Sequence, residues 1–187
     1  DAERLLEHLE VKEAVFVGCS IGGMIAQGLA VKRLDQIRAL VLTSTATKIA
    51  TPEIWQERID QVRAYGMITL ADPTLQRWFP KAFRDSPEGL LWRERLIACD
   101  PEGYAACAAA IAGSDFYTTT ASLTLPTLAI AGSEDGSTPP DLVRETAELI
   151  RGSRFQLIRG AGHIPALDRP AEYAAALVTF LDSIGHG

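Results

Sequence analysis

Four short segments of the chain are rich in apolar and β-forming residues. They cover residues 14–18, 38–44, 126–132 and 154–159. The first, Ala-Val-Phe-Val-Gly, shows no alternation of apolar and polar positions, which is typical of a strand buried on both faces. The pattern therefore predicts four buried strands spread along the chain.

Between these segments the apolar residues recur at helical spacing. Leu5, Leu6 and Leu9 form one such stripe with acids between them, and they predict an amphipathic helix over residues 1–10. Similar patterns predict helices over 24–31, 140–151 and 170–184. Strands that alternate with helices build βαβ units, so we expect an α/β fold with a mostly parallel sheet flanked by helices.

The stretch from about residue 51 to residue 122 breaks this alternation and contains no buried-strand run. Prolines punctuate it, which predicts several short helices. It carries all three tryptophans of the chain: Trp55, Trp78 and Trp92. We expect a helical cap over 51–122, inserted into a core formed by 1–50 and 123–187, and such lids commonly carry substrate contacts.

The composition narrows the possible functions. Of the 187 residues, 47% are hydrophobic and 22% charged, ordinary globular proportions that argue against a disordered, collagenous or coiled-coil chain. Lys and Arg number 18 against 24 Asp and Glu, a formal charge of −6, whereas a nucleic-acid-binding surface is normally basic. No apolar run approaches the roughly 18 residues of a transmembrane helix. We expect neither a nucleic-acid nor a membrane partner.

The three cysteines, Cys19, Cys99 and Cys107, are an odd number and lack C-x-x-C or zinc-binding spacing. We expect reduced, mostly buried thiols in a cytoplasmic protein, with no metal and no cofactor. Cys19 fits a small buried neighbour of the following serine better than a second nucleophile.

The strongest chemical signal is Gly18-Cys19-Ser20-Ile21-Gly22, which matches the pattern G-x-S-x-G. It follows a predicted strand and opens a predicted helix, the context of a nucleophile elbow. Such a turn strains the serine backbone, and we expect close packing at both glycines to leave no room for side chains. Ser20 is the predicted nucleophile and the Ile21 N–H a predicted oxyanion donor. The alternative is a glycine-rich turn that only closes tightly or holds a phosphate.

A serine nucleophile needs a base, and the base needs an orienting acid. Of the three histidines, His8 precedes the serine and His186 lies in the last two residues, which usually fray. His163 follows the fourth predicted strand and is the expected base. Asp135 follows the third predicted strand and is the expected acid, with the neighbouring Glu134 as its rival.

The chain order Ser20, Asp135, His163 is that of α/β-hydrolases, and it differs from the order in chymotrypsin or subtilisin. All three residues follow strand ends, where open α/β sheets place their sites. Over essentially its whole length the sequence resembles the α/β-hydrolase superfamily. Its elbow sequence, residues 17–27, looks like that of the small-molecule branch, and the choice of Asp135 over Glu134 rests mainly on this resemblance.

Two segments of the predicted cap, residues 74–79 and 100–107, resemble the cap of 3-oxoadipate enol-lactonases. These β-ketoadipate-pathway enzymes of aromatic catabolism open an enol-lactone that carries a free carboxylate. The resemblance implies a carboxylic-ester hydrolase with Ser20, Asp135 and His163 as the catalytic residues. It places the contact with the substrate carboxylate on Arg77 and Trp78. Without the resemblance, Arg77 would be a solvated cap arginine and Trp78 a packing residue of the cap.

In the implied mechanism His163 deprotonates Ser20 as the serine attacks the acyl carbon, and Asp135 fixes the imidazole tautomer. The ring oxygen leaves as an enol that becomes a ketone, and water hydrolyses the acyl-enzyme. The expected partner is therefore a small-molecule lactone or ester. Three alternatives on the same scaffold are a carboxylesterase, a carbon–carbon bond hydrolase and a cofactor-free perhydrolase. A non-catalytic ligand-binding member is a fourth alternative, from another functional class.

Members of this family carry several strands and a helix ahead of the elbow, and an HG-type loop that supplies the second oxyanion donor. Nothing before Gly18 matches those elements. We therefore expect on the order of 70–80 further residues upstream, and we expect the function to need them. The segment 137–140 is also shorter and more polar than the resemblance predicts after the acid.

Overall fold

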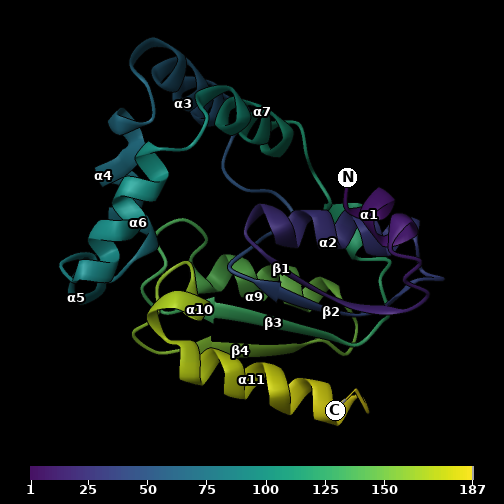
Figure 1. Ribbon diagram of the computed structural model, residues 1–187. Helices are drawn as coiled ribbons and strands as arrows, with labels where there is room; N and C mark the ends of the chain where they lie inside the picture. Colours follow the sequence, from purple (N-terminus) through teal and green to yellow (C-terminus); the bar gives the residue numbers. More distant parts are fainter. Residues whose placement is uncertain (187) are drawn as a thin grey trace.

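The computed structural model describes residues 1–186, which contain a four-stranded parallel sheet with helices on both faces (Figure 1). The strands lie in the order β1-β2-β3-β4, and each neighbouring pair is parallel. Every predicted strand is present, and each observed end lies within one residue of its predicted end. The strands are β1 (Ala14–Cys19), β2 (Ile37–Thr43), β3 (Thr127–Gly132) and β4 (Arg154–Ile158).

Four helices outside the predicted cap lie where the periodicity places them: α1 (Ala2–His8), α2 (Ile21–Lys32), α9 (Pro140–Leu149) and α11 (Pro170–Ser183). The short α10 (Pro165–Asp168), between β4 and α11, was not predicted. Within residues 1–186 no helix combines the length and the apolar character needed to cross a bilayer.

Alternating side chains of the central strands face opposite sides of the sheet. Leu40 and Leu42 of β2 pack with α2, whereas Val41 between them packs in the cluster that contains Phe180 of α11. α9 covers β3 on the face opposite α11. The sheet is therefore the middle of three layers, with α2 and α9 on one face and α11 on the other; Figure 1 shows α2 above the strands and α11 below them.

β1 lies at one edge of this sheet, with β2 as its single neighbour among the described residues. Its side chains from Ala14 to Phe16 are only partly buried, and Val17 is 45% exposed. The expectation that this strand is buried on both faces is therefore wrong. An apolar sequence favours burial, but an edge position provides neighbours on one side only.

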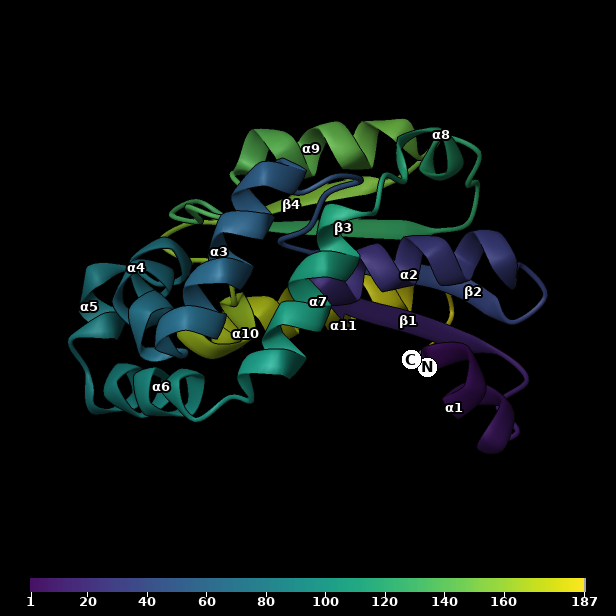
Figure 2. The same ribbon diagram turned by 90° about the horizontal axis from the view of Figure 1, so that it is seen from above.

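Five helices gather beyond the carboxyl ends of the strands, and Figure 2 shows them beside the sheet. Helices α3 (Pro52–Tyr65), α6 (Pro87–Ile97) and α7 (Pro101–Ala112) each begin with a proline that follows a capping side chain, as expected for a first helical residue. The short α8 (Tyr117–Thr120) packs instead against α2 and α9. The five helices are α3 (Pro52–Tyr65), α4 (Ile68–Trp78), α5 (Lys81–Arg84), α6 (Pro87–Ile97) and α7 (Pro101–Ala112).

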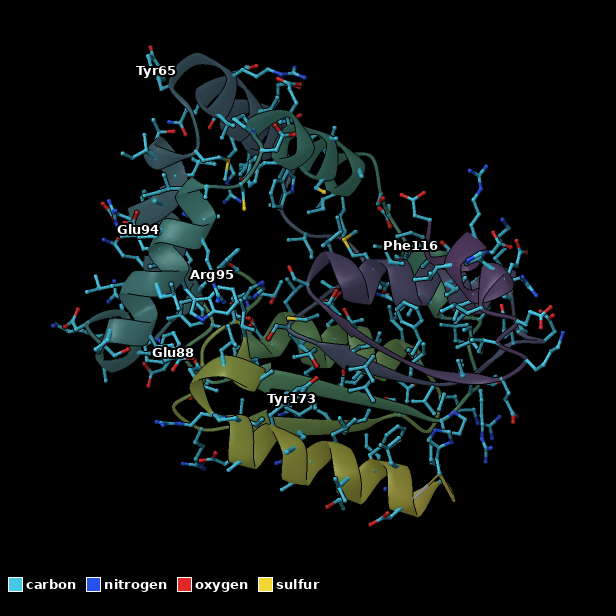
Figure 3. The ribbon with its side chains drawn as sticks, viewed as in Figure 1. Tyr65, Glu88, Glu94, Arg95, Phe116 and Tyr173 are labelled. Carbon is cyan, nitrogen blue, oxygen red and sulfur yellow. The ribbon has the colours of Figure 1, made fainter. Side chains whose placement is uncertain are left out.

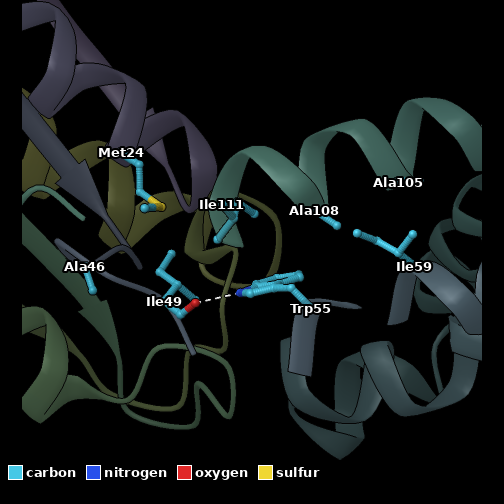
Figure 4. Packing of buried hydrophobic residues seen from close by; sticks show 8 residues of the cluster. All are labelled: Met24, Ala46, Ile49, Trp55, Ile59, Ala105, Ala108 and Ile111. Atoms are coloured by element: carbon cyan, nitrogen blue, oxygen red, sulfur yellow. Dashed lines mark hydrogen bonds between the residues drawn. The ribbon is translucent and has the colours of Figure 1, made fainter. Parts of the chain in front are cut away.

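An apolar cluster joins α3 and α7 to α2 and to the segment after β2 (Figure 4). Met24 from α2 is buried there against residues of α3 and α7. The Trp55 Nε1–H donates to the Ile49 carbonyl at 2.6 Å, so the indole is held by a polar contact as well as by packing. The buried members are Met24, Ala46, Ile49, Trp55, Ile59, Ala105, Ala108 and Ile111. The division into core 1–50 plus 123–187 and cap 51–122 stays a prediction.

The cysteines differ from the expectation of mostly buried thiols. Cys19 is partly buried, but Cys99 and Cys107 are exposed. Helix α7 turns Ala105 and Ala108 toward the apolar cluster, which leaves position 107 on another face of the helix. Cys99 comes after the end of α6, where the chain turns toward α7 at the surface.

Candidate active site

Ser20 occupies the sharp turn between β1 and α2. Its φ of 55° and ψ of −119° are strained for a residue with a side chain. The Ser20 N–H donates to the Thr43 carbonyl at 2.9 Å, and the Thr45 hydroxyl donates to the Ser20 carbonyl at 2.7 Å. Two bonds from the end of β2 thus hold the strained residue. Ile21 is the first residue of α2, so its N–H has no partner within the helix and is available as a donor.

The glycines of the turn differ in what requires them. A Cβ on Gly18 would lie 2.2 Å from the Gly22 carbonyl oxygen, so this position excludes a side chain. A Cβ on Gly22 would have no neighbour within 4 Å, so the expected close packing there is wrong. The crowded position is Gly23, whose Cβ would lie 2.4 Å from Thr45 Cγ2. The backbone of Gly22, rather than its missing side chain, makes the close approach.

His163 and Asp135 are joined by a buried hydrogen bond. Nδ1 of His163 lies 2.8 Å from Oδ2 of Asp135, and the two side chains are 2% and 0% exposed. An ionised carboxylate only accepts hydrogen bonds, so the contact requires the proton on Nδ1. Nε2 is then left with the lone pair that a general base needs.

The loop after β3 surrounds the Asp135 carboxylate with donors. Oδ1 accepts from the backbone N–H groups of Ser137 and Thr138 at 2.7 and 3.0 Å. Oδ2 accepts from the Thr138 hydroxyl at 2.7 Å, and that hydroxyl also lies 3.3 Å from Nδ1 of His163. Glu134, the rival acid, is exposed. The short, polar segment after the acid therefore positions the carboxylate.

Ser20 and His163 line one cavity of about 220 Å³, together with Ile21, Arg77 and Trp78. Among the described residues no hydrogen bond joins the serine hydroxyl to the imidazole. Catalytic hydrogen bonds are often long before substrate binds and then tighten. The structure thus brings all the predicted site residues to one place, and their roles stay proposals.

Cys19, next to the serine, is a poor nucleophile. Burial, with a further contribution from the negative charge of Asp135, raises the pKa of its thiol to about 12. The thiol is therefore protonated at neutral pH, and the thiolate is the reactive form. Its Sγ lies 3.6 Å from the His163 carbonyl, so the thiol packs under the histidine loop.

The carbonyls of the last two residues of α4 accept hydrogen bonds from the loops that carry Asp135 and His163. The Gly136 N–H donates to the Arg77 carbonyl at 2.9 Å, and the His163 N–H donates to the Trp78 carbonyl at 2.6 Å. Carbonyls at a helix end have no partner within the helix, so they are free for such bonds. The Arg77 guanidinium donates to the Thr74 hydroxyl at 3.1 Å, and the Trp78 ring stacks on His163.

Three residues of the site were not predicted from the sequence: Arg58, Tyr104 and Thr138. Arg58 of α3 and Tyr104 of α7 line the cavity. Tyr104 lies in the segment that resembles the enol-lactonase cap, and Thr138 has the local signal of a hydroxyl three residues after an aspartate. Arg58 lies one helical turn after Trp55 and has no distinguishing pattern of its own. Among residues 1–186 no cluster of His, Cys, Asp and Glu could hold a metal ion.

The fold and the site's geometry agree with the comparisons with known proteins. The chain belongs to the alpha/beta hydrolase family, whose model matches residues 1–176. It is similar to 3-oxoadipate enol-lactonase 2 of Acinetobacter baylyi, at 32% identity over 95% of this chain and 67% of that protein. A pimeloyl-(acyl-carrier protein) methyl ester esterase of Vibrio vulnificus is 24% identical over 96% of this chain and 74% of that protein.

Two solved structures are similar over nearly the whole chain. The enol-lactonase from Burkholderia xenovorans LB400 has a TM-score of 0.91 and 33% identity, over 97% of this chain and 70% of that one. An esterase from Thermogutta terrifontis, solved with malate bound, has a TM-score of 0.90 and 30% identity, over 98% and 70%. The predicted α/β-hydrolase fold and the resemblance to enol-lactonases are confirmed.

Proposed function

We propose that this chain carries the catalytic residues of a serine hydrolase that opens 3-oxoadipate enol-lactone to 3-oxoadipate in aromatic-compound catabolism. One observation carries the proposal. A single small cavity is lined by Ser20 on its strained turn, by His163 bonded to a buried Asp135, and by Arg77. These are a nucleophile, a base with its orienting acid, and a cation for the substrate's carboxylate.

In the proposed first half-reaction the Ser20 oxygen attacks the lactone carbonyl carbon, and Nε2 of His163 takes the serine proton. The Ile21 N–H donates to the oxygen that becomes negatively charged. The bond from the acyl carbon to the ring oxygen then breaks. That oxygen takes the proton back from His163 and becomes an enol, which tautomerises to the ketone.

In the second half-reaction a water molecule attacks the acyl-enzyme while His163 removes one of its protons. The bond to Ser20 breaks, the serine recovers its proton, and the product leaves with a new carboxylate. Asp135 stays ionised throughout and stabilises the imidazolium that forms in each half-reaction. The Ser137 and Thr138 donors hold the carboxylate in the required orientation.

The substrate class rests on Arg77 and on the relatives. Arg77 is half-buried at the cavity wall, where a guanidinium can bind a carboxylate through two parallel hydrogen bonds. Both curated enol-lactonases of Acinetobacter baylyi match this chain, at 32% and 29% identity. The similar Thermogutta esterase was solved with malate, a dicarboxylate. The unpaired cysteines support the cytoplasmic location that belongs to the proposal.

A carboxylesterase on the same scaffold is the second candidate, because esterases also stand among the relatives and the similar structures. Both candidates use the same triad and differ in the leaving group and in the need for a substrate carboxylate. Rates on the enol-lactone and on simple p-nitrophenyl esters separate them. Preference for the simple esters, with no effect of Arg77→Ala, would support the esterase instead.

The test of the proposed function is turnover of 3-oxoadipate enol-lactone by the purified protein. Ser20→Ala should abolish it, and Asp135→Asn should lower kcat by about 10³- to 10⁴-fold because the imidazole loses its required tautomer. Glu134→Gln is the matched control, since it removes the neighbouring exposed carboxylate. Tight binding of the lactone without any Ser20-dependent turnover would indicate a non-catalytic ligand-binding protein.

A further inference from the structure

A second arginine faces the proposed catalytic cavity. Arg58 of α3 and Arg77 of α4 both line it, and among the described residues none of its lining side chains is an Asp or Glu. The guanidinium carbon of Arg58 lies 4.6 Å from the centre of the Trp55 ring. Because Trp55 is itself buried and hydrogen-bonded to Ile49, Arg58 stacks on a fixed surface.

The charges of these two arginines are not neutralised by the protein. In the part of the chain that the structure describes, neither forms an ion pair with a carboxylate. Two other arginines of this region are paired, Arg63 with Glu102 at 2.8 Å and Arg93 with Asp72 at 2.6 Å, and neither lines the cavity. Two neighbouring cations without a counter-charge repel each other, and an anion bound between them would relieve that repulsion.

The ionisation of the neighbouring groups agrees with this picture. Burial and then the positive charge of Arg58 lower the pKa of Arg77 below its ordinary value. Burial raises the pKa of the half-buried Tyr104, and the charges of Arg58 and Arg77 oppose that shift. Tyr104 is therefore a neutral hydroxyl within the field of both guanidiniums, where it can donate a hydrogen bond to an anion.

Arg58 and Arg77 also lie at the boundary between two cavities. Both line a second, outer groove of about 780 Å³, formed by residues of α3 and α4. The acids Glu57 and Asp60 line that outer groove and not the catalytic cavity. The two arginines thus lie between the cavity that contains Ser20 and His163 and the groove on the outside of the cap. Because Ser20 and both arginines line the same cavity of about 220 Å³, a substrate that contacts all three has a small acyl group.

We propose that Arg58, Arg77 and Tyr104 together form an anion subsite that takes a carboxylate at the far end of the substrate's acyl group. This inference rests on the proposed function and adds Arg58 and Tyr104 to it. Hydrolysis of such a substrate yields a dicarboxylate, with one new carboxylate beside Ser20 and the other at the subsite. Short dicarboxylates should therefore bind as product analogues.

The experiment compares two p-nitrophenyl substrates, the hemiester of glutarate and the neutral butyrate ester, by their ratio of kcat/KM. Arg58→Gln should lower the hemiester-to-butyrate ratio by about 10- to 100-fold, because a hydrogen-bonded charge pair is lost. Tyr104→Phe should lower it by about 3- to 10-fold. An unchanged ratio in Arg58→Gln would overturn the inference.

Arg95→Gln is the matched control. Arg95, labelled on α6 in Figure 3, stacks over Trp92 at the same 4.6 Å as Arg58 over Trp55, but it does not line the cavity. The control removes one cap guanidinium and one cation–ring contact, so it should keep the substrate ratio. An equal fall of the ratio in Arg95→Gln would show that the net charge of the cap, rather than the subsite, sets the preference.

Binding separates this inference from the proposed function. Glutarate binding to Ser20→Ala, measured by calorimetry, should weaken about 10-fold or more when Arg58→Gln is added. If no ester is hydrolysed in a Ser20-dependent way, the proposed function fails while this binding still tests the subsite. If hydrolysis depends on Ser20 but Arg58→Gln leaves the affinity for glutarate unchanged, the proposed subsite is wrong and the hydrolase proposal stands.

Discussion

The indole of Trp78 lies nearly parallel to the imidazole of His163, with ring centres 5.8 Å apart and planes at 21°. The carbonyl of the same tryptophan accepts the backbone N–H of the histidine at 2.6 Å. In the proposed mechanism His163 becomes a cation in each half-reaction, and an aromatic face attracts a cation. Trp78 therefore has the contacts of a positioning residue for the base, in addition to its proposed contact with substrate.

Replacing the Trp78 ring tests that positioning. Trp78→Leu should lower kcat by about 3- to 30-fold, because the imidazolium loses its aromatic neighbour. Trp78→Phe should recover most of the loss, and both variants keep the backbone bond to His163. Steady-state kinetics on the neutral butyrate ester measures this without the substrate carboxylate. Trp92→Leu is the control. If Trp78→Leu raises KM and leaves kcat unchanged, Trp78 contributes to substrate binding and not to positioning His163.

The elbow glycines should respond differently to a methyl group. Gly23→Ala should lower the free energy of unfolding by about 1–3 kcal/mol, because its Cβ would lie 2.4 Å from Thr45 Cγ2. Gly22→Ala has open space around it and lies in α2, so its change should stay within about 1 kcal/mol, with alanine favoured. Urea unfolding measures both. An equal loss of unfolding free energy in the two variants would mean that helix geometry, rather than contact with Thr45, causes the loss.

Asp168 should make stability depend on pH. Its Oδ2 accepts the Gly162 N–H at 2.6 Å, while its buried Oδ1 has no partner among residues 1–186. Burial raises its pKa above the ordinary value of about 3.9 for aspartate. Between that value and the raised one, the folded protein holds more of this proton than the unfolded chain. The stability from this group is therefore present at low pH and is lost as pH rises through the window.

Asp168→Asn keeps an oxygen acceptor for Gly162 and removes the titration. Urea unfolding between pH 4 and pH 7 should then show a free energy that falls less steeply with rising pH than in the unmodified protein. Identical slopes in the two proteins would mean that the Asp168 carboxyl titrates alike in the folded and unfolded states.

The three cysteines should differ in their reactivity toward an alkylating reagent. In the folded protein an alkylating reagent should label the exposed Cys99 and Cys107, and Cys19 only after unfolding, because its pKa is raised to about 12. Cys107 also lines the cavity, so a bulky label there should inhibit hydrolysis. Mass spectrometry of labelled protein checks the sites. Inhibition that persists in the double variant with Cys99→Ser and Cys107→Ser would implicate Cys19 instead.

The order of strands and helices was predictable because local signals coincide at each of them. The run from Ala14 to Gly18 favours a strand, and the glycines after it favour a turn into a helix. The apolar run of β1 alone did not indicate its partial exposure, because such a run shows that a strand can be buried and not which neighbours lie beside it. Gly22 and Gly23 look alike in the sequence, and only the position of Thr45 makes the second one crowded.

Part of the candidate site follows from local sequence, and part forms only in the folded chain. Ser20, Asp135 and His163 each follow a strand, so one motif and the chain order were enough to select them. Arg58 and Tyr104 come from two separate cap helices, and their side chains face one cavity only after those helices pack. No residue spacing in the sequence indicates that these two side chains line the same cavity.

The carbonyls at the end of α4 have a consequence for how this fold can change. The bonds from Gly136 and His163 go to the backbone of residues 77 and 78, so any amino acid at those positions can make them. Substitutions at these positions would therefore change the shape and charge presented to a ligand, and at Trp78 also the ring beside His163, while the loops of Asp135 and His163 keep these backbone bonds. Single substitutions would thus give new ligand selectivity at this end of the cavity, with no change to the loops that carry Asp135 and His163.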